Sequence, residues 1–225
     1  MKVINLSSLD GNNGFRLDGV ADSLWRGQRG DHSGYSVSNA GDVNGDGYDD
    51  VIVGAPHANP SKDYGFPLGS SYVVFGKASG FSAAVALSSL DGNNGFRLDG
   101  GTEHILELSG SSVSGAGDTN GDGYDDVIIG APAVAFCDEC NISGISYVVF
   151  GKASGFRAAL DLSSLDENSG FHMGGGTYSN FGRSVSSAGD INGDGLDDVI
   201  IDADGYLTDG GIGRGGSFVI FGKNP

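Results

Sequence analysis

The sequence predicts an all-β protein made of one unit repeated three times, and two observations carry this prediction. First, three motifs recur along the 225 residues: LSSLDGNNGFRLDG at 6–19 and 87–100 with LSSLDENSGFHMGG at 162–175, SYVVFGK at 71–77 and 146–152 with SFVIFGK at 217–223, and a nine-residue acidic segment that starts at 42, 118 and 190. Second, the apolar runs are short, rich in Val and Ile, and separated by turns rich in Gly, which favours short strands over helices.

Each unit is expected to contain four short strands. In the first unit they lie at 36–40, before the acidic segment, then at 50–55, 71–76 and 95–99. Four strands of about five residues without a helical period are typical of a β-propeller blade. We therefore expect one array over 1–225, with repeats of approximately 1–77, 78–152 and 153–225. The equivalent strands are predicted at 112–116, 126–131, 146–151, 170–173, 184–188, 198–203 and 217–222.

The order of the strands leaves the two ends of the array unmatched. The chain begins with an outer-strand segment at 15–18 and ends just after a third strand at 218–221. If each outer strand comes from the next repeat, the last blade lacks its outer strand and the first segment lacks its blade. Two chains could form a homodimer that closes a ring of six blades by exchanging these segments. The chain could also be an excerpt of a longer array, and the sequence leaves both readings open.

Composition excludes several partners. The formal net charge is −17, from 29 acidic and 12 basic residues, and no basic stripe offsets it. Such a surface repels nucleic acids and anionic membranes. No run reaches a membrane-spanning length, and the start MKVINLSSLDG lacks the apolar core of a signal peptide. We therefore expect a cytoplasmic chain, a chain exported by another route, or a piece of a longer secreted protein.

The acidic segments DVNGDGYDD, DTNGDGYDD and DINGDGLDD have the pattern of a metal-binding loop. Oxygen-bearing side chains stand at positions 1, 3, 5 and 9, and Gly at positions 4 and 6 allows a tight wrap that offers the position-7 carbonyl. This all-oxygen set suits Ca²⁺ better than Mg²⁺. Position 12 lies in a strand and is not the Glu of an EF-hand, and a metal-free turn is the alternative.

We therefore predict three structural Ca²⁺ sites, one per repeat, in which the position-7 residue contributes its carbonyl. The position-8 residues Asp49, Asp125 and Asp197 are expected to hydrogen-bond around the sites. The predicted ligands are Asp42, Asn44, Asp46, Tyr48 and Asp50; Asp118, Asn120, Asp122, Tyr124 and Asp126; and Asp190, Asn192, Asp194, Leu196 and Asp198.

The chain resembles the FG-GAP repeats of the integrin α-subunit β-propeller, in the form common in bacterial secreted arrays. The residues that carry the resemblance are Phe75-Gly76 with Gly54-Ala55-Pro56 and Phe150-Gly151 with Gly130-Ala131-Pro132. The third repeat keeps Phe221-Gly222 but has Asp202-Ala203-Asp204 in place of Gly-Ala-Pro, which puts its turn geometry in doubt.

The resemblance implies a protein outside the cell or at its surface that binds a protein or glycan ligand or mediates adhesion. It implies that calcium is a structural ion and that the blades themselves are not catalytic. Family propellers usually have seven blades, more than the three repeats found here. Binding is expected on the segments that vary between repeats, at 20–32, 57–70, 101–109, 133–145 and 203–214.

A propeller lectin is the competing function, and an enzyme is a remote one. A lectin could stack Trp25 on a sugar, but repeats two and three have Glu103-His104 and Tyr178 near the equivalent place, and Trp25 could equally pack between blades. For an enzyme, no Ser has Gly at both −2 and +2, and the four His do not recur between repeats.

Three shorter motifs give weaker signals. Cys137 and Cys140 form a CxxC that favours a small-loop disulfide over a redox dithiol or free thiols, and a zinc site would need further ligands. Arg29-Gly30-Asp31 spells a cell-adhesion tripeptide, for which chance is the better explanation. GIGRGG at 211–216 leads into a strand and is interpreted as a loop.

Overall fold

The computed structural model describes residues 5–21, 24–25, 28–58, 66–101, 106–134, 143–174, 179–205 and 215–223. In these residues the regular elements are strands and three short 3-10 helices, η1 (Leu6–Ser8), η2 (Leu87–Ser89) and η3 (Leu162–Ser164). No helix among them has the length and apolar character needed to cross a membrane. The prediction of an all-β protein is therefore confirmed.

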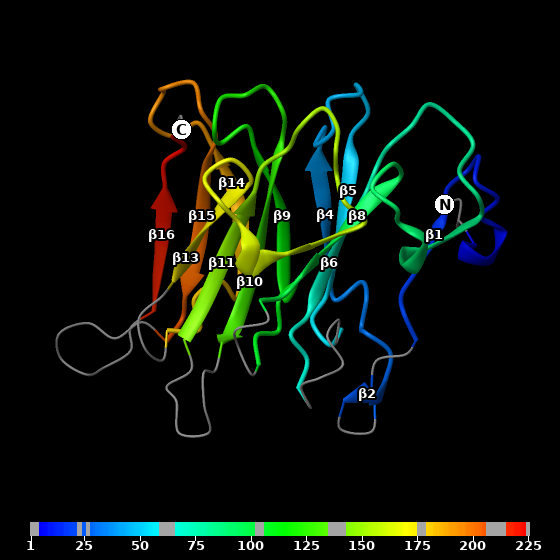
Figure 1. The fold of residues 1–225 in the computed structure, drawn as a ribbon, viewed down its shortest axis with the longest axis horizontal. Helices are drawn as coiled ribbons and strands as arrows, with labels where there is room; N and C mark the ends of the chain where they lie inside the picture. The colour runs from blue at the N-terminus through cyan, green and yellow to red at the C-terminus, as the bar shows by residue number, and fades with distance from the viewer. Residues whose placement is uncertain are drawn as a thin grey trace.

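The strands form three antiparallel blades that lie side by side (Figure 1). The predicted four-stranded blade is confirmed for the first two repeats, and the third sheet has three strands in the described residues. Closure into a ring stays a prediction. The blades are β4 (Ser36–Gly41), β5 (Asp50–Ala55), β6 (Ser70–Val74) and β8 (Gly95–Asp99); β9 (Ser112–Gly117), β10 (Asp126–Val134), β11 (Ser143–Val149) and β13 (Gly170–Gly174); and β14 (Val185–Gly189), β15 (Asp198–Ala203) and β16 (Gly216–Ile220).

The first two blades take their outer strands from the following repeat, as the strand order predicted. β8 and β13 carry the GF motif that opens repeats two and three, and they pair with β6 and β11. Two short strands that were not predicted add parallel pairings: β12 (Ala159–Asp161) pairs with β8, and β7 (Ala84–Ala86) pairs with β1 (Arg16–Asp18). A further hairpin, β2 (Leu24–Trp25) and β3 (Gln28–Arg29), lies in the variable segment of repeat one.

The core consists of layers between neighbouring blades. Ile52, Val73 and Phe96 of the first blade pack against Val127 and Ile129 of the second. The layer between the second and third blades is built the same way, from Ile128 and Val148 against Val199 and Ile201. The central strands of the second blade are therefore covered by neighbouring blades on both faces, and those of the first blade are covered on their other face by Leu87 and Leu90, which explains their nearly continuous apolar sequences. Burying one such side chain contributes about 1.5–3 kcal/mol.

The Gly-Ala-Pro motif begins with Gly because the next blade approaches the backbone there. A Cβ added at Gly54 would lie 2.0 Å from the carbonyl oxygen of Gly110, and one added at Gly130 would lie 1.9 Å from that of Gly182. In the third repeat this position is Asp202, whose carboxylate accepts a hydrogen bond from the Ser184 N–H. β15 continues as a strand through Ala203, so the changed motif does not break the blade.

We expect Gly130→Ala to lower the free energy of unfolding by about 1–3 kcal/mol, because the added methyl overlaps the Gly182 carbonyl and forces two blades apart. Gly174→Ala is the matched control, because a Cβ at Gly174 meets nothing within 4 Å. Thermal and urea unfolding of both variants measure the difference. Equal losses in the two variants would contradict the close approach.

Candidate metal centres

The three acidic loops occupy the same place in every blade, between its first two strands. A register shift interrupts the pairing just before each loop, at 39–41 in the first blade, and the two other blades have a shift at the same place. Gly41 adopts a φ of 75° there, a conformation that favours Gly. The shift turns the chain so that the acidic residues leave the sheet and form a separate loop at one end of the blade.

Positions 1, 3 and 5 converge on one another in each loop. In the first loop, Asp42 accepts hydrogen bonds from the N–H groups of Asp46 and Gly47 at 2.9 and 2.8 Å, and the Asn44 side-chain amide donates to the Asp46 carboxylate at 3.0 Å. The Asp46 carboxylate also accepts from the Tyr48 N–H at 3.0 Å. The same contacts recur among Asp118, Asn120, Asp122, Gly123 and Tyr124, and among Asp190, Asn192, Asp194, Gly195 and Leu196.

The position-9 carboxylate plays a different part, because it is fully buried and joins two segments. One oxygen of Asp50 accepts from the Val43 N–H at 3.0 Å, and the other accepts from the N–H of Gly76, the glycine of the FG motif, at 2.8 Å. The contact therefore ties the loop to the end of the third strand. Asp126 makes the same contacts with Thr119 and Gly151, and Asp198 with Ile191 and Gly222.

Burial raises the pKa of two of these carboxylates, Asp50 and Asp126. Desolvation raises the pKa of Asp50 to about 6 and that of Asp126 to about 7, despite the backbone hydrogen bonds that lower both values. The negative charges of Asp46 and Asp42 raise the pKa of Asp50 further, and Asp122 does the same for Asp126. Each loop therefore concentrates negative charge around a carboxylate that water does not reach.

The position-8 residues join neighbouring loops. Asp125 accepts a hydrogen bond from the Asp42 N–H at 2.7 Å, and Asp197 accepts one from the Asp118 N–H at 3.0 Å. The Asp125 N–H donates back to the Asp42 carbonyl at 3.3 Å. The sequence predicted hydrogen-bonding residues around the sites, and the structure adds that Asp125 and Asp197 each bind the loop of the preceding repeat. Asp49 is the equivalent residue in the first loop, and no loop precedes it in the described chain.

The donor chemistry of the loops fits a calcium-sized ion, although the predicted ligands are not all gathered at one point. In the described residues, no group of three or more His, Cys, Asp or Glu side chains lies together as a ready-made metal site, and the position-9 carboxylate is fully buried. Each of its oxygens still has a second lone pair for a cation. The described ion pairs do not reach the loops, so no basic side chain there neutralises them; those pairs are Arg16–Asp18, Arg97–Asp99 and Arg183–Asp204.

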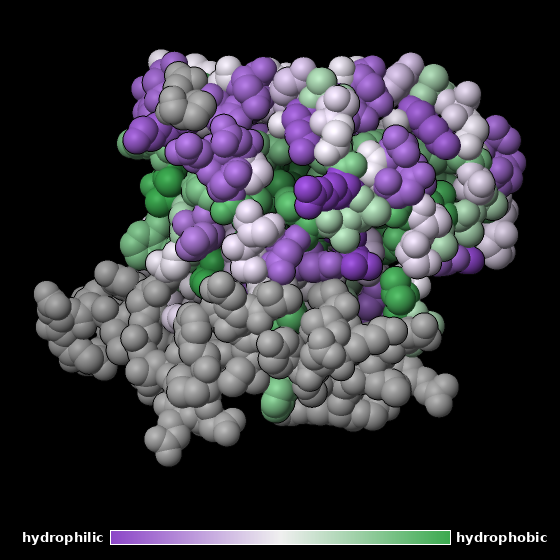
Figure 2. Space-filling view, viewed as in Figure 1, coloured by the Kyte–Doolittle hydropathy of each residue, from purple (hydrophilic) through white to green (hydrophobic). Residues whose placement is uncertain are grey.

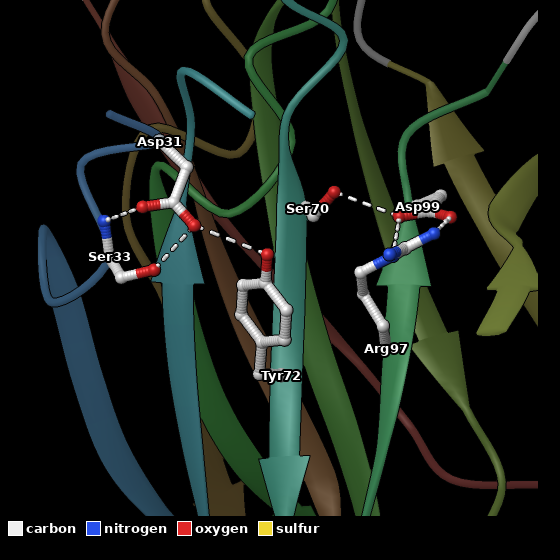
Figure 3. Close-up of polar contacts among 6 residues, drawn as sticks. All are labelled: Asp31, Ser33, Ser70, Tyr72, Arg97 and Asp99. Atoms are coloured by element: carbon white, nitrogen blue, oxygen red, sulfur yellow. Dashed lines mark hydrogen bonds and ion pairs between the residues drawn. The ribbon is translucent and has the colours of Figure 1, made fainter. Parts of the chain in front are cut away.

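The aspartate of the cell-adhesion tripeptide is not displayed for recognition. Asp31 is buried, and its carboxylate accepts hydrogen bonds from the Val20 N–H at 2.9 Å, from Ser33 and from the Tyr72 hydroxyl at 3.2 Å (Figure 3). These contacts occupy the carboxylate inside the first blade. Other predicted features lie outside the described residues: Glu103, His104, Cys137, Cys140, Tyr178, the segment 211–214 and the side chain of Trp25.

Comparison with known proteins identifies the repeat. A family model described as FG-GAP repeat matches residues 33–74 and 109–149. The chain is 34 % identical over 183 residues to integrin alpha-PS5 of Drosophila melanogaster and 32 % identical over 190 residues to integrin alpha pat-2 of Caenorhabditis elegans. These matches cover 79 % and 78 % of this chain but only 15 % and 14 % of the relatives.

A third relative carries a different name. The chain is 31 % identical over 178 residues to a phosphatidylinositol-glycan-specific phospholipase D of Bos taurus, a match that covers 75 % of this chain and 18 % of that protein. The chain thus corresponds to a small part of each of these relatives.

We expect the calcium-free chain to lose stability as the pH rises through the pKa of Asp126. Burial raises this pKa from its ordinary 3.8 to about 7, so between those values the folded state binds a proton that the unfolded state has released. The stabilisation is complete below about pH 4 and is lost as the pH passes about 7. Urea unfolding across this range, in chelator, should show a smaller pH slope for Asp126→Asn than for the exposed control Glu167→Gln.

Proposed function

The chain carries FG-GAP repeats and is related to integrin α subunits, and from this premise we propose that it is an extracellular β-propeller scaffold, stabilised by calcium, that serves adhesion or ligand binding. The observation that carries the proposal is the threefold recurrence of one loop geometry, in which positions 1, 3 and 5 meet above a buried position-9 carboxylate. Recurrence in three blades points to a structural ion rather than to a single reactive centre.

Calcium in these loops would neutralise carboxylates that otherwise repel one another. In the first loop Asp42, Asn44 and Asp46 would provide side-chain oxygens, with the Tyr48 carbonyl and Asp50 completing the set. The ion supplies positive charge; the protein holds the oxygens through the backbone hydrogen bonds already described. Because the position-8 aspartates join successive loops, an ion in one loop would also support the contact to the next blade.

The ligand surface lies at the end of the blades opposite to the calcium loops. β4 and β5 are antiparallel and joined by the acidic loop at one end, so the connection from β5 to β6 lies at the other end. β8 runs antiparallel to β6 and ends at the same side. The described strand ends that border the variable segments 57–70 and 101–109 therefore lie at the same end of the first blade. Because the two ends are separate, the sequence of the connections at the variable end can change without altering the acidic loops that stabilise the blades.

We propose no catalytic role for the blades. The phospholipase D relative raises an enzymatic alternative, but the chain covers only 18 % of it. Among the acids whose pKa is raised, Asp50 and Asp126 are buried, and each holds both carboxylate oxygens in hydrogen bonds to the backbone. These two carboxylates stabilise the fold, and a substrate could not reach them.

Calorimetric titration should detect three calcium ions per chain, and Asp122→Asn should reduce this number to two, because Asp122 is central to the second loop. Each ion that binds only the folded state adds about 2.7 kcal/mol at a calcium concentration 100 times its Kd, so chelation should lower the melting temperature. Glu167→Gln is the control for loss of an acid outside the loops. Equal melting temperatures in calcium and in chelator would exclude a structural role for the ion.

Ligand binding can be tested on a printed panel of extracellular-matrix proteins and glycans. We expect binding to a protein on the panel that is lost when residues 59–65 are replaced by a Gly-Ser segment of the same length, because this segment differs most in sequence between the repeats and connects β5 to β6. Replacement of residues 78–80, at the calcium end, is the matched control. Binding to glycans alone that is lost in Trp25→Ala would instead support the lectin alternative.

A further inference from the structure

We propose that Glu107 positions the variable ends of the first two blades, and that it does so only as a neutral acid that carries its proton. It lies in the connection from β8 to β9, at the end of the blades opposite to the acidic loops. The inference rests on the proposed function, because the segments expected to bind a ligand lie at that end. It adds to that function a residue that holds these segments and a pH at which it releases them.

The backbone of Glu107 joins the variable segments of two blades. Its N–H donates to the Pro67 carbonyl at 3.5 Å, and its own carbonyl accepts from the Ala133 N–H at 3.3 Å. Pro67 lies in the connection between β5 and β6 of the first blade, whereas Ala133 lies near the end of β10 in the second. A displacement of Glu107 therefore disturbs both neighbouring segments as well as its own.

The turn that follows Glu107 bridges the same two blades. The Ser109 N–H donates to the Leu68 carbonyl of the first blade at 2.9 Å, and the Gly110 N–H donates to the Gly130 carbonyl of the second at 3.1 Å. Between them and Glu107 stands Leu108, whose φ of 55° is a conformation that residues with a side chain rarely adopt. Because this backbone is strained, the turn keeps its shape only through its contacts.

The same turn occurs in all three repeats, and the residue before the left-handed one is buried each time. The buried residues are Asp31, Glu107 and Ser179, and the left-handed ones are His32, Leu108 and Asn180. The third strand carries Tyr72 and Tyr147 in the two repeats with an acid, and Phe218 in the repeat with Ser179. The acid and the tyrosine are present or absent together, which indicates that they act as a pair.

The two acids differ in their hydrogen bonds. Asp31 accepts from the N–H groups of Val20 and Ser33 and from the Tyr72 hydroxyl (Figure 3). These donors suit a carboxylate, which only accepts hydrogen bonds. Glu107 is fully buried, and neither of its carboxylate oxygens has a hydrogen bond of normal geometry in the described residues. Since a buried ion without such bonds is strongly disfavoured, Glu107 is held as a neutral acid.

The groups that face Glu107 support the same protonation state. Burial raises the pKa of Glu107 from its ordinary 4.5 to about 8, and the negative charge of Asp161 on β12 raises it further. The Tyr147 hydroxyl on β11 and the Gly101 N–H lower this pKa only in part. In the part of the chain that the structure describes, no basic side chain contributes to lowering it. Glu107 is therefore protonated at neutral pH and becomes charged as the pH passes about 8.

The acids at the other end of the blades meet water instead. Figure 2 shows mainly hydrophilic residues over the end that carries the acidic loops, and Asp46 in the first of these loops is exposed. On the side of Glu107, β8 contributes Arg97 and Asp99, which form an ion pair with each other at 2.6 Å. Loss of the proton from Glu107 thus creates a charge that neither water nor a basic partner compensates, and the segments must separate to admit water.

Amide hydrogen exchange tests the proposal without any ligand. Opening exposes Glu107 to water, where its pKa is ordinary, so the opening equilibrium should rise about tenfold per pH unit between pH 5 and pH 8. The Ser109 and Ala133 amides should therefore exchange faster in the wild type than in Glu107→Gln, which stays neutral, by a ratio that grows about tenfold per unit. The Asp125 amide at the calcium end is the control, and its ratio should stay constant. A constant ratio at Ser109 and Ala133 would overturn the proposal.

Two further variants separate a neutral acid from any buried side chain. Glu107→Ala should speed exchange at Ser109 and Ala133 at every pH, and Glu107→Gln should restore protection, because it keeps the shape without the charge. Asp31→Asn is the matched contrast in the first blade: it should speed exchange of the Ser33 amide at every pH, because an amide nitrogen then faces hydrogen-bond donors. A Glu107→Gln variant as poorly protected as Glu107→Ala would contradict the inference.

The printed panel of extracellular-matrix proteins and glycans, probed at pH 6.5 and pH 9, connects Glu107 to binding. Wild-type binding should weaken at least tenfold at pH 9, whereas binding by Glu107→Gln should change less than twofold. Equal weakening in both proteins would show that Glu107 does not position the binding segments, and would overturn the inference. Absence of binding at both pH values would count against the proposed ligand binding instead, and the exchange ratios would still decide whether Glu107 holds the variable end.

Discussion

One buried carboxylate per blade supports most of the structure described here. Asp50 and its equivalents hold the N–H of the second loop residue and the N–H of the FG glycine, so one side chain fixes where the acidic loop starts and where the third strand ends. A buried charge without partners would destabilise the fold by several kcal/mol, and these two hydrogen bonds offset only part of that. The position therefore demands both the FG glycine and the acidic loop, because each supplies one of the two N–H groups that hold the carboxylate. This shared contact explains why the two motifs occur together in every repeat.

The fold could be predicted because the sequence signals for strands and turns are short and occur in all three repeats. Short runs rich in Val and Ile predicted the strands. The GF motif near the start of each repeat predicted that the outer strand of one blade belongs to the next repeat. β7 and β12 could not be predicted, because three residues of ordinary composition, such as those of β12 (Ala159–Asp161), acquire strand pairing only from the outer strand beside them. The missed strands depend on tertiary contact, which no short sequence window contains.

The acidic loops could also be located from the sequence, although their role as metal sites stays a prediction. Oxygen-bearing side chains at fixed spacing identified the loops, and the structure brings positions 1, 3 and 5 together. Two roles depend on residues far away in the sequence. Asp125 contacts the loop of the preceding repeat, 83 residues earlier, and the Gly76 N–H reaches back 26 residues to Asp50. Asp31 shows the reverse case, in which a familiar tripeptide is committed to a tyrosine and a serine inside the blade (Figure 3).

The overlap between repeat and blade also affects how such a gene can grow or shrink. Each repeat begins with the outer strand of the blade before it. A duplicated unit therefore brings the outer strand that its preceding blade needs, and its own blade is completed by the repeat that follows. This holds wherever the recombination breakpoint falls within the unit. Blade number can then change without new interfaces having to evolve. The identical LSSLDGNNGFRLDG at 6–19 and 87–100 is the kind of sequence that unequal crossing-over needs to find its register. The architecture that joins the blades thus makes their number easy to alter.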